Sequence, residues 1–203
     1  MPSTSARAKV EAMRKEQARR ARKQRMIYVG SGVVVIALIV ALVVWAVVRK
    51  GATTASASGT GLFTYSNLSR NHVTGPVNYP QTPPVGGDHS AVWLNCGIYD
   101  QPVPNVNAVH SLEHGAIWIT YQPSLPADQV AILKNDVRNQ PYGLLSPYPG
   151  IPTPVVATVW GVQLRLDNAS DPRLQSFITK YADATQAPEP RGECTGGTGT
   201  PQG

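Results

Sequence analysis

The sequence predicts an α+β protein in which one transmembrane helix precedes a small extracytoplasmic domain with a largely antiparallel sheet and two helices. A long uncharged apolar segment predicts the transmembrane helix, and the strand and helix patterns that follow it predict the mixed domain. The 18 prolines and 18 glycines among the 203 residues imply long, ordered loops around the sheet. We divide the chain into a basic arm, a transmembrane helix, a flexible linker, the domain and a disordered tail: 1–25, 26–48, 49–61, 62–194 and 195–203.

The transmembrane segment runs from Met26 to Val48 and contains 23 residues without a charge. As a helix rising about 1.5 Å per residue it would be about 35 Å long, which is enough to cross a hydrocarbon core of about 30 Å. A cleaved signal peptide is the alternative, but the apolar core of a signal peptide has only about 7–15 residues. Trp45, near the end of the segment, is typical of an interfacial anchor, so we expect this anchor to be retained.

Charge predicts the orientation of the anchor and argues against nucleic acid as a partner. Nine basic and two acidic residues precede Met26, so the positive-inside rule places the N-terminus in the cytoplasm and the domain outside the cell membrane. We expect the basic arm to lie against the lipid bilayer, and a cytoplasmic partner for it stays open. From Gly51 onward seven basic and ten acidic residues give a net charge of −3, which offers no electrostatic footprint for phosphate backbones.

Three segments of the domain have residue types that are typical of strands. The segment His72–Tyr79 alternates weakly in polarity and is followed by a proline, which predicts a short strand. The segment Ala116–Tyr121 (AIWITY) is aromatic and β-branched, which predicts a buried strand. The segment Val155–Leu166 (VVATVWGVQLRL) predicts one long strand.

Two segments predict helices. Pro126–Gln140 carries apolar residues at helical spacing and has Asp128 near its start, where a negative charge is favourable. A last helix begins after Asp171, which is a capping residue followed by proline, and runs to Tyr181.

The two cysteines, Cys96 and Cys194, both fall in the predicted outer domain, where oxidising conditions allow a disulfide to form. We predict that they pair and close a loop of nearly one hundred residues, which stabilises the domain by about 2–4 kcal/mol in the chain-entropy model. Two unpaired thiols are the alternative. A further alternative is Cys96 as a metal ligand, which its position seven residues after His89 and fourteen before His110 permits without favouring.

All four histidines lie within one fifth of the chain: His72, His89, His110 and His114. Imidazole is the commonest metal ligand and the usual proton carrier near neutral pH, so we look for function here. Before His89, two prolines impose a rigid approach and two glycines permit a sharp turn, in the run TPPVGGD at 82–88. We expect this loop to hold His89 in a defined position.

His110 and His114 belong to the run HSLEHG, and what they can bind depends on its secondary structure. Asn107 as an N-cap and Gly115 as the residue after the C-cap predict a two-turn helix from Ala108 to His114. On a helix the two side chains share one face at about 6 Å, whereas on a strand they would stand about 13 Å apart. A helix is therefore a condition for any metal site that uses both.

Three interpretations of this cluster stay open. In the first, the histidines pack against aromatic side chains and Glu113 forms a buried ion pair. In the second, an imidazole from His89 or His72 joins the helical pair in a three-histidine site for zinc or copper, with no thioether because every methionine precedes the domain. In the third, His-x-x-Glu-His is the inverted zinc-peptidase signature with Glu113 as base, and its third, acidic ligand would come from the proline-rich C-terminal stretch.

The motifs Pro-Pro-x-Gly-Gly-x-His (83–89) and His-Ser-Leu-Glu-His-Gly (110–115), with the tyrosines and tryptophans around them, resemble a bacterial family of single-pass membrane proteins. That family is known only as a domain of unknown function. The resemblance covers roughly His72 to Cys194, and the family usually has Ser-Gly where this chain has Gly86-Gly87, which leaves the turn intact. The resemblance implies no reaction, ligand or partner.

Two classes of function fit these observations. We favour a noncatalytic extracytoplasmic module of an envelope complex, with a tryptophan- and tyrosine-rich face as the site for a protein partner. The alternative is a small copper- or zinc-binding protein, or a metal-dependent hydrolase with Glu113 as base. The sequence contains no nucleophile elbow, phosphate loop, dinucleotide fingerprint or iron–sulfur cysteine set, which favours a noncatalytic role and leaves zinc or copper as the candidate cofactor.

Overall fold

The computed structural model describes residues 19, 54–57 and 60–202. The chain forms two units, Met1–Ala52 and Thr53–Gly203, and the second of these is the folded domain. Among the described residues no helix is long and apolar enough to cross a membrane. The segment Met26–Val48, for which we predict the transmembrane helix, lies outside the described residues, as does nearly all of the basic arm.

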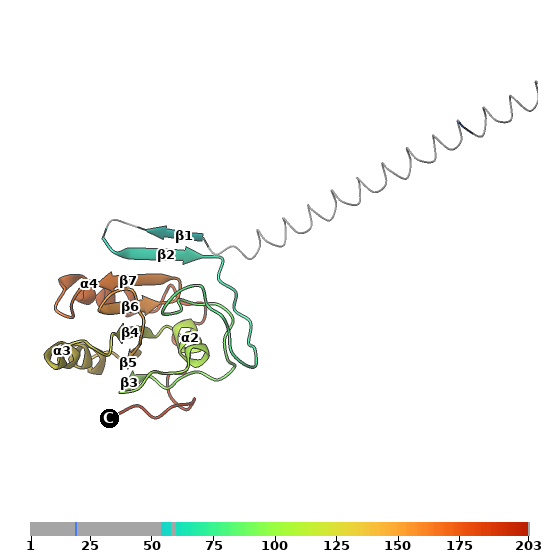
Figure 1. The fold of residues 1–203 in the computed structure, drawn as a ribbon. Coiled ribbons are helices and arrows are strands. Elements are labelled where there is room, and N and C mark those ends of the chain that lie inside the picture. The colour runs from blue at the N-terminus through green and yellow to red at the C-terminus, as the bar shows by residue number, and fades with distance from the viewer. Residues whose placement is uncertain (1–18, 20–53, 58–59, 203) are drawn as a thin grey trace, which may run out of the picture. The chain divides into compact units, whose positions relative to one another are not determined.

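The domain is built on one seven-stranded sheet with the strand order β1-β2-β7-β6-β4-β5-β3 (Figure 1). Most neighbouring strands are antiparallel, while β5 is parallel to both β4 and β3. The strands are β1 Thr54–Ala57, β2 Leu62–Ser66, β3 Gly97–Ile98, β4 Ile117–Tyr121, β5 Gly143–Pro147, β6 Val155–Val159 and β7 Val162–Leu166.

Three helices of the described chain cover this sheet: α2 Asn105–Glu113, α3 Ala127–Arg138 and α4 Pro172–Tyr181. Helices α3 and α4 pack on one face of the sheet and α2 packs on the other (Figure 1). The α+β class is confirmed, but the expected number of two helices was wrong. The additional helix is α2. It contains His110 and Glu113, so the run HSLEHG is helical and not a strand.

Strand β4 lies inside the sheet and is buried along its whole length. Its side chains alternate between the two faces: Ile117 and Ile119 pack with α3 and α4, while Trp118 packs with α2. Because helices cover both faces, the strand needs apolar side chains on both, which explains its near-continuous apolar sequence. The buried strand predicted over Ala116–Tyr121 is confirmed.

The two helix predictions are also confirmed, as α3 and α4. Leu133 and Val137 are the buried residues of α3, as their helical spacing indicated. At the start of α4, the Asp171 carboxylate accepts a hydrogen bond from the Arg173 backbone N–H at 2.9 Å, and Pro172 occupies the first turn.

The prediction of one long strand over Val155–Leu166 was wrong, because the segment is the hairpin of β6 and β7. Trp160 and Gly161 form the two-residue connection, and Gly161 has a φ of +74°, which a glycine adopts without strain. The residue that could have indicated this turn in the sequence is Gly161, a glycine in the middle of the apolar run.

The predicted strand His72–Tyr79 was wrong as well. Only His72 pairs there, in an isolated parallel bridge with His89. Gly75 has a φ of +96° and the next residue, Pro76, has no N–H to donate, so an extended ladder cannot continue.

The C-terminal segment 195–202, for which we expected disorder, lies along the chain that leads into β3. The backbone N–H of Thr198 donates to the Trp93 carbonyl at 2.9 Å, and that of Gln202 donates to the Ile98 carbonyl at 2.8 Å. A Cβ on Gly197 would lie 2.3 Å from the Trp93 carbonyl oxygen, so the glycines serve close packing. At the other end, part of the expected linker forms β1.

Candidate metal centre

Helix α2 supplies one apolar face to the core and one polar face to the site. Ala108, Val109 and Leu112 pack against Trp118 of β4. The polar residues His110, Glu113 and His114 follow one another at the spacing of one helix face, and their exposed fractions are only 4%, 3% and 5%. Buried polar groups of this kind require partners, so their contacts decide what the site can do.

The C-terminal end of α2 fixes the position of His114. The N–H of Gly115 donates to the Leu112 carbonyl at 3.0 Å and that of Ala116 to the Ser111 carbonyl at 2.9 Å, which is a Schellman motif. The φ of +102° at Gly115 confirms the residue predicted to follow the C-cap.

The predicted start of α2 was wrong, because the helix begins at Asn105 after Pro104 and no side chain caps it. Asn107, the expected N-cap, instead donates from Nδ2 to the Val92 carbonyl at 2.7 Å. It therefore ties the loop before β3 to the helix.

His89 and His72 lie side by side because their backbones pair. The N–H of Val73 donates to the His89 carbonyl at 2.8 Å, and the N–H of His89 donates to the Asn71 carbonyl at 3.0 Å. Gly86 has a φ of +141°, and a Cβ there would lie 2.8 Å from the Leu68 side chain. The glycine turn therefore allows the loop to pack tightly and to place His89 in the interior, where its exposed fraction is 0%.

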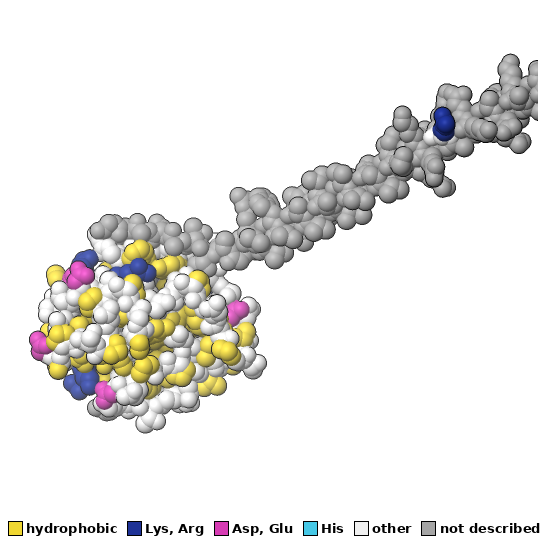
Figure 2. Space-filling model, viewed as in Figure 1, with side chains coloured by type: hydrophobic (Ala, Val, Ile, Leu, Met, Phe, Trp, Pro, Cys, Tyr) yellow, Lys and Arg dark blue, Asp and Glu magenta, His cyan; other side chains and the backbone are white. Residues whose placement is uncertain are grey.

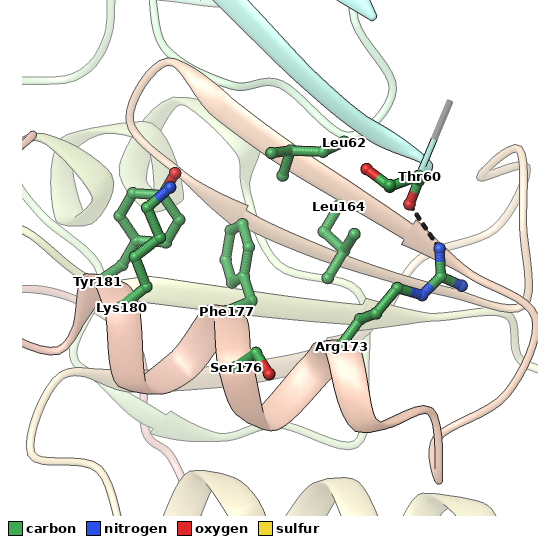
Figure 3. Close-up of a pocket in the computed structure, with 8 residues that line it drawn as sticks. All are labelled: Thr60, Leu62, Leu164, Arg173, Ser176, Phe177, Lys180 and Tyr181. Atoms are coloured by element: carbon green, nitrogen blue, oxygen red, sulfur yellow. Dashed lines mark hydrogen bonds between the residues drawn. The ribbon is translucent and has the colours of Figure 1, made fainter. Parts of the chain in front are cut away.

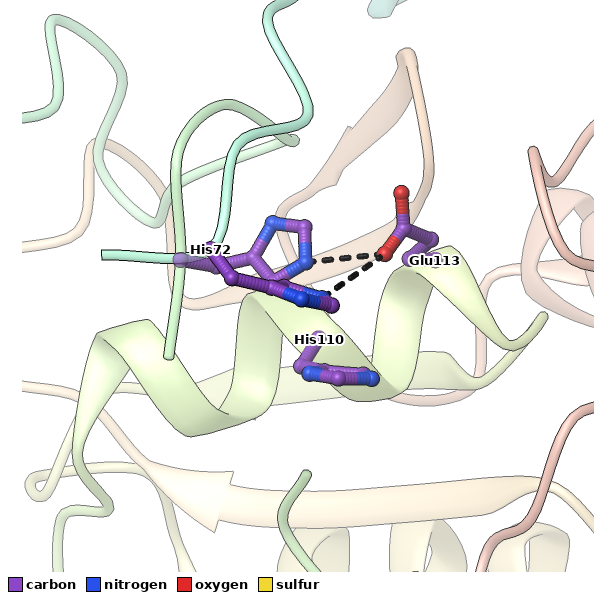
Figure 4. A group of neighbouring side chains, drawn as sticks. His72, His110 and Glu113 are labelled. Carbon is purple, nitrogen blue, oxygen red and sulfur yellow. Dashed lines mark ion pairs between the residues drawn. The ribbon is translucent and has the colours of Figure 1, made fainter. Parts of the chain in front are cut away.

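These elements bring four donors together: one ligand atom each of His72, His89, His110 and Glu113, all within 4.8 Å of one another. Figure 4 shows the Glu113 carboxylate reaching from α2 toward the rings. Its Oε2 lies 2.8 Å from His89 Nε2 and 3.9 Å from His72 Nε2. Three of the donors are buried, whereas half of the His72 side chain is exposed.

The backbone fixes the tautomer of the three buried histidines. The Nδ1 atom of each lies 2.6–2.7 Å from a carbonyl oxygen, which belongs to Gly87 for His89, Ser90 for His110 and Glu193 for His114. A carbonyl only accepts hydrogen bonds, so Nδ1 carries the proton in each neutral ring. The Nε2 lone pairs are therefore available, which is the arrangement in which metal-binding histidines are usually held.

Burial and the three neighbouring histidines lower the pKa of His110 to about 4, against the opposing effect of its hydrogen bond to Ser90. His110 is thus neutral at pH 7 and offers a lone pair. His89 Nε2 also lacks a hydrogen-bond partner among the described residues, because Glu113 Oε2 lies close to it without the direction of a hydrogen bond. Adjacent ligand atoms of one metal ion approach each other in this way, close together but without a hydrogen bond between them.

His114 lies beside the group of four donors without belonging to it. Its Nε2 is 2.9 Å from His110 Nε2 and 3.7 Å from Glu189 Oε2. The ring of Trp93 lies against both imidazoles, with centroids 5.8 Å from His110 and 5.4 Å from His114. The sequence indicated all four histidines, but it did not separate His114 from the others, and it treated Glu113 as a base or an ion-pair partner.

The predicted disulfide joins Cys96 and Cys194, whose Cα atoms are 5.3 Å apart. It excludes Cys96 as a metal ligand. It also anchors a segment, 187–194, that runs along the end of α2: the Arg191 N–H donates to the His114 carbonyl at 3.0 Å, and the Glu193 carbonyl binds the ring of His114.

A separate groove of about 280 Å³ lies between α4 and the strands β2 and β7 (Figure 3). Leu62, Leu164 and Phe177 form its apolar wall, and Arg173 closes one end by donating to the Thr60 carbonyl at 2.5 Å. None of the four donors lines it. On the face in Figure 2, the few Lys and Arg side chains of the domain are interspersed with Asp and Glu side chains and form no extended basic patch.

Comparison with known proteins shows that the chain belongs to a family described as protein of unknown function (DUF3105), whose model matches residues 72–196. This range contains every histidine, Glu113, Glu189 and both cysteines. No curated protein and no solved structure matches the chain.

Proposed function

We propose that this protein binds one copper(II) or zinc ion through His89, His110, Glu113 and His72, on the outer side of a membrane to which the segment 26–48 anchors it. The observation that carries the proposal is that four possible ligand atoms from three chain segments lie within 4.8 Å of one another. Three nitrogens and one carboxylate oxygen suit both metals.

The simpler alternative is a buried ion pair between His89 and Glu113 within a packed aromatic cluster. A buried ion pair overcomes its desolvation cost only when good hydrogen bonds join the charges. The two side chains are 2.8 Å apart, but no hydrogen bond joins them. A metal ion bound to both would satisfy the lone pair and the charge together.

One donor distance, that between His89 Nε2 and Glu113 Oε2, fits copper(II) better than zinc. Two ligand atoms 2.8 Å apart, each about 2.0–2.1 Å from one ion, subtend an angle of about 90° at it. This is the angle between neighbouring ligands in tetragonal copper(II) sites. Tetrahedral zinc would hold the two atoms about 3.3 Å apart.

His72 completes the site as the ligand that is easiest to exchange. Its ring stacks on that of His110 with an interplanar angle of 12°, whereas the His89 ring stands at 69° to the His110 ring. The lone pairs of parallel rings do not converge on one point, so His72 must rotate to bind. Its half-exposed side chain has room to do so.

We keep Glu113 as a ligand and not as a catalytic base, because its carboxylate is directed at His89. A role in an envelope complex is compatible with the metal site, but the described surface gives that role less support. Trp118 and Trp160 are buried, and the exposed large hydrophobic side chains among the described residues are Val92 and Ile132, at 46% and 37%. We therefore prefer metal binding to a role in an envelope complex as the proposed function.

The test is metal binding by the 203-residue chain, purified in a mild detergent and stripped with a chelator. We expect one copper(II) ion per chain after desalting, a tetragonal copper EPR spectrum and a higher melting temperature. At a free concentration of about 100 Kd, the ion stabilises the fold by about 2.7 kcal/mol, which corresponds to a rise of about 5–11 °C.

Glu113→Gln keeps the shape of the side chain and removes the charged ligand, so it should weaken binding. Asp128→Asn, which removes the same charge from α3, is the matched control and should bind as the unchanged chain does. A chain that keeps neither copper nor zinc and melts at the same temperature in their presence would overturn the proposal.

A further inference from the structure

The rings of His110 and His114 meet at hydrogen-bond distance, although neither Nε2 atom carries a proton in the neutral tautomers. Their Nε2 atoms are 2.9 Å apart and both rings are buried. Both Nδ1 protons are already donated to carbonyl groups, of Ser90 and of Glu193. In the neutral rings, two lone pairs therefore face each other, which is repulsive unless a positive charge lies between them.

The surroundings of this pair provide for a cation. Glu189 Oε2 lies 3.7 Å from His114 Nε2 and brings a negative charge, and the Glu189 side chain is 60% exposed. The two rings are nearly perpendicular, at 84°, so both lone pairs can reach one ion from different directions. At bond lengths of about 2.0–2.1 Å, two nitrogens 2.9 Å apart subtend an angle of about 90°.

The chain segment that carries Glu189 is held in place by backbone hydrogen bonds and by the disulfide. The Glu189 N–H donates to the Glu113 carbonyl at 3.0 Å, and the Cys96–Cys194 disulfide fixes the segment further along. Gly192 lies directly against the His114 ring, where a Cβ would come within 2.6 Å of it. The packing thus fixes the His114 ring and brings the segment with Glu189 beside it.

We propose that His110, His114 and Glu189 form a second position for the same copper(II) ion, here called the outer position, and that the inner position uses His72, His89, Glu113 and His110. This inference rests on the proposed function. His110 has one free lone pair, so it binds an ion in one position or in the other but not in both. The two positions are therefore alternatives for a single ion.

The consequence is a route for exchange. An ion in the inner position has three buried donors besides the half-exposed His72, whereas in the outer position it has two buried imidazoles and the Glu189 carboxylate, whose side chain is 60% exposed. A ligand from solution, or from another copper-binding protein, reaches the ion more easily in the outer position. Movement of the ion between the two positions needs only an exchange of the ligands around His110.

The test uses copper(II) as the probe on the 203-residue chain. A variant with His89→Ala and Glu113→Gln lacks the inner position, and we expect it still to bind one copper(II), about 10–100-fold more weakly, with a changed EPR spectrum. A variant with His114→Ala and Glu189→Gln should also bind one ion, but should release it to EDTA at least tenfold more slowly. Adding His110→Ala to either variant should remove the remaining binding.

The outcomes separate the two proposals. If the unchanged chain binds no copper, the proposed function fails. If it binds one ion and the variant without the inner position binds none, the outer position does not exist and the inner site stands. Two ions bound at once would refute the sharing of His110, and equal release rates would refute the exchange route. Circular dichroism shows whether each variant folds, and Glu113→Gln alone is the milder replacement if the double variant does not.

Discussion

Gly115 joins helix α2 to the central strand β4, and we predict that Gly115→Ala destabilises the domain strongly. Its φ of +102° places it in a conformation that residues with a side chain rarely adopt. A Cβ at this position would also lie 2.3 Å from the Cβ of Ala184, where about 3.5–4.0 Å is the normal contact. The substitution thus meets both a backbone cost and a steric one.

The two costs can be added from the structure. A left-handed conformation costs a residue with a Cβ about 1–2 kcal/mol, and overpacking by one methyl group costs about 1–3 kcal/mol. The total is about 2–5 kcal/mol, which lowers the melting temperature of a chain of this size by about 4–20 °C. The neighbouring His114 must shift with the helix end, so copper binding at the outer position should weaken as well.

Gly150→Ala is the matched control, because Gly150 has a φ of +80° but a Cβ there would meet nothing within 4 Å. It should show the backbone cost alone, about 1–2 kcal/mol. The assay is thermal unfolding followed by tryptophan fluorescence in the same detergent. If the two variants melt at the same temperature, the contact with Ala184 has no energetic weight and the reasoning is refuted.

Three further predictions concern other parts of the domain. Replacing Cys96 and Cys194 with serine removes a cross-link across 98 residues and should cost about 2–5 kcal/mol, and an unchanged melting temperature would contradict this. Asp171→Ala removes the cap of α4 and should cost about 1 kcal/mol, whereas Asp171→Asn should cost less, so that equal losses would exclude capping as the cause. Copper(II) should quench the fluorescence of Trp93, whose ring lies 5.8 Å from that of His110, and quenching that survives His110→Ala would place the ion elsewhere.

Local sequence patterns predicted those elements whose cause is local. Strand β4 follows from a β-branched and aromatic run, α3 from helical spacing, and α4 from Asp171 followed by proline. The hairpin of β6 and β7 was missed because its apolar run continues across the turn, and only Gly161 marks the connection. At the C-terminus the glycine-rich composition predicted disorder, which was wrong. The glycines there allow the chain to pack closely against Trp93.

The candidate site was predictable as a list of residues but not as an arrangement. The clustering of histidines and the glycine turn before His89 pointed to the right part of the chain. The grouping depends on contacts that no local pattern encodes, such as the bridge between His72 and His89. Glu189 lies 75 residues after His114 in a proline-rich stretch, yet its segment is hydrogen-bonded to the end of α2, next to His114.

The deeper reason is that the acceptors which orient the rings are backbone carbonyls. Those of Gly87, Ser90 and Glu193 hold the Nδ1 protons, and a carbonyl carries no signature of residue type. The free Nε2 atoms are therefore a product of the path of the chain and not of neighbouring side chains. It follows that a change which moves the backbone, such as loss of the disulfide next to Glu193, should disturb the His114 ring more than a side-chain replacement at Glu193 does.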